Sequence, residues 1–147
     1  MKSKLLNPSP KTFAIIFNTG DKVVESLTNF ARKNQLGASQ FTAIGAFSEV
    51  ALGFFVPDKK SYTKIILREQ VEVLSMIGDI TLKEGAPQLH AHVVVGRVDA
   101  TAHGGHLIEA VVRPTLEVVL TESPEHLHRT FDPESGLALI DLEADKH

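Results

Sequence analysis

Apolar side chains between Asp21 and Asn34 recur at the spacing of an amphipathic helix. They follow the order i, i+1, i+4, i+7 and i+8: Val23, Val24, Leu27, Phe30 and Ala31. Asp21 precedes the first of them and is a suitable N-cap, and Gly37 suits the exit of the helix. The pattern predicts one main helix that packs a single apolar stripe against the rest of the domain.

The remainder of the chain consists of short apolar or alternating runs separated by turn residues, as is typical of strands. We expect strands at Thr12–Asn18, Phe41–Ala46, Ser48–Val56, Tyr62–Arg68, Val71–Met76, Ile80–Leu82, Leu89–Val98, Leu107–Val112 and Leu116–Leu120. Pro114, between the last two, should permit only an edge position or a break. The fold class predicted is α+β: a mostly antiparallel sheet of about eight strands packed with the one main helix.

The pattern also divides the chain into three parts. Residues 1–10 form a leader, residues 11–122 the domain, and residues 123–147 a C-terminal extension that packs on the domain. Within the last part, the stretch up to Gly136 is predicted to be irregular because prolines and polar residues interrupt it. Leu137–Leu142 is apolar enough to return as a short strand or a docked tail.

Composition narrows the possible functions. The 147 residues are the size of one domain, and with no cysteine any metal site must use His, Asp or Glu. A net charge of −3 with scattered arginines argues against direct binding to DNA. No apolar segment resembles a signal peptide or a membrane span, so we expect a cytoplasmic protein.

Histidines are concentrated between Leu89 and Leu107, which contains four of the seven in the chain. His90 and His92 alternate onto the same face of a predicted strand, with Cα atoms roughly 6–7 Å apart, and can converge on one divalent ion. A third imidazole could come from a turn at 102–106, from either His106 or His103. Three imidazoles leave a zinc ion one open coordination position, which could hold water, an anion or a partner's carboxylate.

Catalytic groups are harder to find. Glu72 and Glu109 could act as a general base toward a metal-bound water, or serve as exposed or orienting carboxylates. The sequence contains no nucleophile motif and no phosphate-binding glycine loop. His126 and His128 lie in a polar, proline-flanked segment and are interpreted as surface residues.

Two adjacent aromatic residues suggest an oligomer. Phe54 and Phe55 must point to opposite faces of their predicted strand. A monomer with a single helix cannot easily cover both faces of its sheet. We therefore expect another subunit to bury one of them.

Several short motifs occur together in a recognisable order. They are Gly20-Asp21, Ile44-Gly45-Ala46, the Glu72–Gly78 segment EVLSMIG, His90-x-His92, Gly104-Gly105-His106-Leu107 and Thr115-Leu116-Glu117-Val118. Over residues 11–122 the chain thereby resembles the Plants and Prokaryotes Conserved (PPC) domain. The tail, with Leu127-x-Arg129 and then Asp132 to Leu137, resembles the extension of bacterial single-domain members.

The resemblance implies an α+β sheet fold, a homotrimer, and a metal site, with zinc as the expected ion, at His90, His92 and His106. In plant relatives an AT-hook precedes the domain and contacts DNA, but this chain has no Arg-Gly-Arg-Pro core. We therefore expect a non-enzymatic homotrimer that binds zinc or another divalent ion and a small ligand or protein partner. One alternative is a zinc-dependent hydrolase or lyase acting on a small polar substrate. The other is a DNA-associated regulatory protein, as family members are often labelled.

Overall fold

The computed structural model describes residues 1–144, and of residues 3 and 5–8 only the backbone. It contains one α-helix, α1 (Val23–Asn34), and one short 3-10 helix, η1 (Pro57–Lys59). The strands are β1 (Lys2–Pro8), β2 (Lys11–Asn18), β3 (Ala38–Val56), β4 (Ser61–Leu67), β5 (Val71–Lys83), β6 (Ala86–Gly96), β7 (Ala102–Glu122), β8 (His128–Asp132) and β9 (Leu137–Asp141). The predicted α+β class is confirmed.

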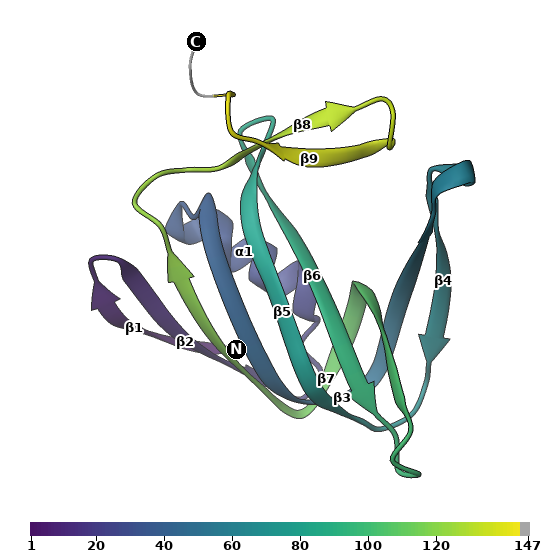
Figure 1. Ribbon diagram of the computed structural model, residues 1–147. Coiled ribbons are helices and arrows are strands. Elements are labelled where there is room, and N and C mark those ends of the chain that lie inside the picture. Colours follow the sequence, from purple (N-terminus) through teal and green to yellow (C-terminus); the bar gives the residue numbers. More distant parts are fainter. Residues whose placement is uncertain (145–147) are drawn as a thin grey trace.

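All these strands belong to one strongly curved sheet (Figure 1), in the order β1-β2-β7-β3-β5-β8-β9. Strand β4 pairs with β3, and β6 pairs with both β5 and β7. Every pairing is antiparallel except the short contact between β5 and β8. Because β3 also pairs with β5 and β7, the four strands β3, β5, β6 and β7 close a ring of neighbours.

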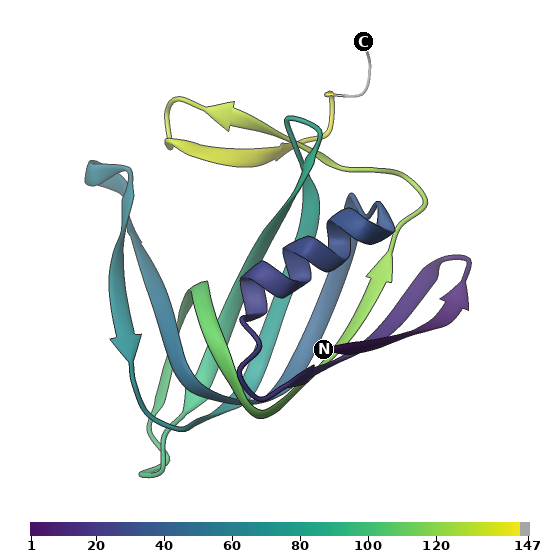
Figure 2. The ribbon, with the colours of Figure 1, turned by 180° about the vertical axis from the view of Figure 1, so that it is seen from behind.

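Helix α1 covers one face of the sheet (Figure 2) and contacts β6 and β7. Four residues of the predicted apolar stripe are buried: Val23, Leu27, Phe30 and Ala31. The fifth, Val24, is partly buried. On β6 the residues Ala91, Val93 and Val95 are buried in the same core. Strand alternation then turns His90, His92 and Val94 to the opposite face, which the helix does not cover.

Three pairs of predicted strands turn out to be single long strands. The runs predicted in 41–56 form β3, those in 71–82 form β5, and those in 107–120 form β7. Pro114 lies inside β7, but it has no ladder partner in β2 or β3, which agrees with the prediction that it permits only an edge or a break. β7 continues through it because the register between β3 and β7 shifts from Gly45↔Leu116 to Phe47↔Val112, and this irregularity accommodates a residue without an N–H.

Gly45 lies at this irregularity and has φ +152°, a conformation that side-chain-bearing residues rarely adopt. A Cβ atom built on it would stand 2.3 Å from the carbonyl oxygen of Thr115 and 2.7 Å from Cα of Leu116. The close approach of β3 to β7 here therefore requires glycine.

The ends of the helix differ from the prediction. The N-cap is Lys22, which makes no side-chain capping bond, and the helix ends at Gln35 in the left-handed conformation, before Gly37. Asp21 instead accepts a hydrogen bond from the amide of Asn18 at 2.9 Å and pairs with the amino group of Met1 at 2.8 Å. Asp21 thus binds the preceding loop residue and the N-terminus, while Lys22 takes the N-cap position.

Both terminal segments are part of the sheet. The predicted leader contains β1, which pairs with β2 along its length. The extension contains the β8–β9 hairpin, which includes residues predicted to be irregular and contacts β5 through Leu82↔His128 and Lys83↔Arg129. Within residues 1–144, none of the helices has the length and apolar character that a membrane span requires.

Candidate metal centre

The structure brings His90, His92 and His106 together on the face of the sheet that α1 does not cover. His90 and His92 are two residues apart on β6, and His106 of β7 lies directly opposite His92 in the antiparallel ladder. The turn predicted at 102–106 was wrong, because these residues are already in β7. The chain reverses at 97–101, where the Asp99 carboxylate accepts hydrogen bonds from the amide and hydroxyl groups of Thr101.

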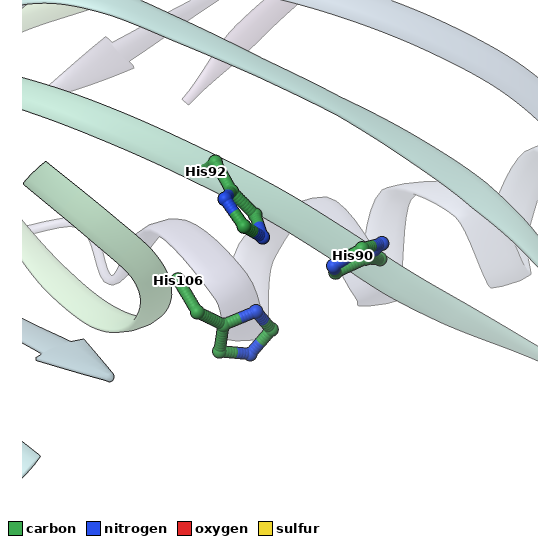
Figure 3. Close-up of side chains that lie close together, drawn as sticks. All are labelled: His90, His92 and His106. Atoms are coloured by element: carbon green, nitrogen blue, oxygen red, sulfur yellow. The ribbon is translucent and has the colours of Figure 1, made fainter. Parts of the chain in front are cut away.

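The three imidazoles surround a common space (Figure 3). One ligand atom from each residue lies within 4.8 Å of those of the other two, and the ring centroids are 5.2–5.7 Å apart. Zinc–nitrogen bonds of about 2.1 Å in tetrahedral geometry place the ligand nitrogens of one ion about 3.4 Å apart. The ligand nitrogens therefore have to come closer together by up to about 1.4 Å to bind one zinc ion.

The burial and the protonation state of the His106 ring are those expected of a metal ligand. Its Nδ1 atom is buried and has no hydrogen-bond partner among the described residues, which is costly for a polar atom. Burial lowers the pKa of His106, and the neighbouring His90 and His92 lower it further. Burial and the proximity of His90 also lower the pKa of His92. Both rings are therefore neutral at pH 7 and have a lone pair available for a cation.

Tyr62 of β4 forms a wall of this site. Its ring stacks on that of His106, with centroids 4.5 Å apart and an interplanar angle of 26°. Gly53 lies opposite His106 in the ladder, and a Cβ atom there would come within 2.8 Å of the Tyr62 ring. The missing side chain of Gly53 is what allows Tyr62 to reach the imidazole.

Asp79 is a site residue that the sequence analysis missed. It lies opposite His90 on β5, and its Oδ2 atom is 3.5 Å from Nδ1 of His90. Burial alone would raise the pKa of Asp79, but interactions with His90 and Arg129 outweigh burial and lower the pKa below its ordinary value. Asp79 is thus a carboxylate at neutral pH, in contact with one of the three imidazoles.

The other candidate histidines do not join the cluster. His103 pairs with Val95 and precedes His106 by three residues in an unbroken part of the ladder. Because an odd separation along a strand reverses the face, His103 points to the side opposite His106. His126 is exposed and His128 is half-buried at the start of β8. The structure therefore brings His106, and not His103, to His90 and His92.

Neither predicted candidate base lies at the site. Glu109 accepts hydrogen bonds from the amides of Val24 and Glu25 at 2.8 and 3.2 Å, so it caps the N-terminus of α1 from a distant strand. Glu72 pairs with Gly96, four residues beyond His92 along β6, or about 13 Å at the rise of a strand. A water held by the three imidazoles is out of reach of both carboxylates.

The cap predicts the effect of removing Glu109. Glu109→Ala should lower the free energy of unfolding of the metal-free protein by about 1–2 kcal/mol, because two helix amides lose their acceptor and the helix dipole its counter-charge. Urea unfolding at fixed protein concentration measures this loss. Glu117→Ala, at an exposed position of the same strand, is the matched control and should change little. Weaker zinc binding by Glu109→Ala with unchanged stability would contradict the capping role.

A surface pocket of about 700 Å³ adjoins the histidines. Its lining includes His90, His92 and Asp79, together with the apolar side chains of Ile77 and Val119. Gln40, Thr42 and Thr121 add an amide and two hydroxyl groups. The pocket provides room for a small molecule beside the imidazoles.

Comparisons with known proteins agree with this architecture. The chain is similar to a protein from Bacteroides thetaiotaomicron to which DNA binding is ascribed, with 30% identity and a TM-score of 0.90 over 96% of this chain and 98% of that chain. It is similar to a plant- and prokaryote-conserved (PPC) protein from Pyrococcus horikoshii, with 30% identity and a TM-score of 0.84 over 95% and 94% of the two chains.

A third relative is described by its metal content. This metal-containing protein from Archaeoglobus fulgidus is 31% identical, with a TM-score of 0.82 over 95% of this chain and 96% of that chain. A comparison with curated protein sequences found no match. The model of the Plants and Prokaryotes Conserved domain, abbreviated PCC or PPC, matches residues 7–124. The chain therefore belongs to the Plants and Prokaryotes Conserved domain family.

Proposed function

We propose that this protein is a non-enzymatic metal-binding module that holds a divalent ion, zinc, with His90, His92 and His106. The observation that carries the proposal is the convergence of three imidazoles, one with an orphaned buried nitrogen. Imidazole is a preferred ligand of zinc, and the chain has no thiolate that would select another soft ion. The relative from Archaeoglobus fulgidus is described as metal-containing, which supports the binding of a metal ion.

A bound zinc ion would keep one coordination position for a small ligand or a donor group of a protein partner. The adjoining pocket combines apolar side chains with hydroxyl and amide groups, which suits a small ligand with a polar end. The zinc-enzyme alternative is weaker, because Glu109 and Glu72 are remote and Asp79 is held by Arg129. Without a general base beside the open coordination position, the site is better suited to binding a ligand than to catalysing its reaction.

We propose further that the module is a homotrimer. Apolar side chains are exposed on the same sheet face as the histidines: Ile44 at 60%, Ile77 at 57%, Val119 at 52% and Val94 at 41%. Phe54, on the β3–β4 hairpin, is 67% exposed. Apolar groups gathered in this way favour association with other copies. DNA is not the partner we propose, since the chain carries a net charge of −3.

Metal analysis tests the central claim. Purified protein incubated with Zn²⁺ and then desalted should retain one zinc per chain, measured by elemental analysis, and native mass spectrometry should give three chains per assembly. His90→Ala should retain much less zinc because only two imidazoles remain. His126→Ala, which removes an exposed histidine away from the cluster, is the matched control and should retain a full equivalent. Wild-type protein that retains no zinc would refute the proposal.

A further inference from the structure

Arg129 places a buried positive charge between the C-terminal hairpin and the sheet. Its side chain is only 8% exposed. Its guanidinium group donates to the Thr81 hydroxyl at 2.6 Å, the Ala138 carbonyl at 2.9 Å and Oδ1 of Asp79 at 2.8 Å. A buried arginine is tolerated only when its donors are satisfied in this way. Arg129 therefore has one partner within its own hairpin and two on β5.

Asp79 is the link between Arg129 and the histidines. One carboxylate oxygen accepts from Arg129, and the other lies 3.5 Å from Nδ1 of His90. The guanidinium holds one oxygen of the carboxylate, and the other oxygen faces the imidazole. Arg129, Asp79 and His90 thus form a chain of contacts from β8, through β5, to β6.

An imidazole that gives its Nδ1 proton to a carboxylate keeps its lone pair on Nε2. In Figure 3 one nitrogen of His90 faces the rings of His92 and His106. We infer that Asp79 is a positioning residue that orients His90 as an Nε2 ligand, and that Arg129 makes the β8–β9 hairpin part of the metal centre by holding Asp79. This inference deepens the proposed metal-binding function and rests on it.

The hairpin has other attachments, so loss of the Arg129 charge should leave it docked. The amide of Leu82 donates to the Leu127 carbonyl at 2.8 Å, and the amide of Leu127 donates to the Gly37 carbonyl at 3.0 Å. At the far end, the ammonium group of Lys60 donates to the Pro133 carbonyl at 2.6 Å. Substitution of Arg129 therefore tests the contact with Asp79 in a protein that is still folded.

The decisive measurement is Zn²⁺ affinity, by competition with a chelator at pH 7.5, for wild type, Asp79→Asn and Arg129→Met. Loss of a group that orients a metal-bound histidine typically weakens binding about 10–100-fold, and we expect this range for both variants. Thr130→Val is the matched control: it removes the neighbouring hydrogen bond to Asp141, within the same hairpin, and should change affinity by less than about twofold. The double variant should bind about as weakly as Asp79→Asn alone, because both changes interrupt one chain of contacts.

A second readout does not need metal. In the metal-free wild type, ¹⁵N NMR should find His90 protonated on Nδ1, and this preference should be lost in Asp79→Asn but kept in Thr130→Val. Wild-type affinity and an unchanged His90 tautomer in both Asp79→Asn and Arg129→Met would overturn the inference while leaving the zinc site intact. Failure of wild-type protein to bind zinc would instead refute the proposed function, and this inference with it.

Discussion

Replacing His106 by alanine should weaken Zn²⁺ binding by more than about 100-fold, whereas replacing His103 should leave it unchanged. A lost ligand removes a coordinate bond, and its effect should exceed the 10–100-fold typical of a lost orienting group. His103 is the matched control, since it lies three residues away on the same strand and faces the opposite side of the sheet.

Competition with a chelator gives both affinities, and the visible absorption of Co²⁺ substituted for zinc reports the ligand set. The His103→Ala spectrum should match that of wild type, and the His106→Ala spectrum should not. Equal losses in the two variants would mean that the ladder register is wrong. A loss in His103→Ala alone would assign the third ligand to His103.

Replacing Gly45 by alanine should destabilise the protein by about 3 kcal/mol or more, or prevent it from folding. Two costs add: a positive φ for a residue with a side chain, about 1–3 kcal/mol, and overpacking, about 1–3 kcal/mol. The overpacking cannot be relieved by a rotamer change, because the Cβ atom would meet backbone atoms of Thr115 and Leu116.

Gly20→Ala separates the two costs. Gly20 has φ +91°, but nothing lies within 4 Å of a Cβ atom built there, so only the conformational cost applies. Urea unfolding at equal protein concentrations should therefore find Gly20→Ala less destabilised than Gly45→Ala. Equal stability of the two variants would show that β3 and β7 can separate at Gly45 without significant cost.

Local patterns predicted the helix and the face on which His90 and His92 lie. Both depend on periodicity alone, which fixes the side of a helix or strand that a residue occupies. The prediction failed in dividing β3, β5 and β7 into two strands each, because the chain stays extended across each local interruption. At Pro114 the ladder with β3 is interrupted, yet β7 continues as one strand.

His106 lies beside His90 and His92 as expected, but not for the reason that the sequence suggested. Gly104 and Gly105 suggested a turn, yet both are strand residues, and the chain reverses at the Asp99–Thr101 hydrogen bonds. A hairpin centred on Asp99 pairs residue 92 with residue 106. An Asp followed two residues later by Thr is a signal from which this pairing could have been predicted.

Asp79 and Arg129 could not have been predicted in this way. They lie 50 residues apart, and their contact depends on a parallel pairing between β5 and β8 that extends over two residue pairs. No local periodicity encodes such a pairing. Tyr62 was missed for a related reason, since its place over His106 depends on β3 pairing with both β4 and β7.

The stacking of Tyr62 on His106 has a spectroscopic consequence. Tyr62 is the single tyrosine of the chain, and there is no tryptophan. Ultraviolet emission from this protein therefore originates almost entirely from a ring whose centroid lies 4.5 Å from that of the imidazole. The molecule carries a built-in fluorophore at its histidine cluster, so occupancy of the cluster can be followed in real time without attaching a dye.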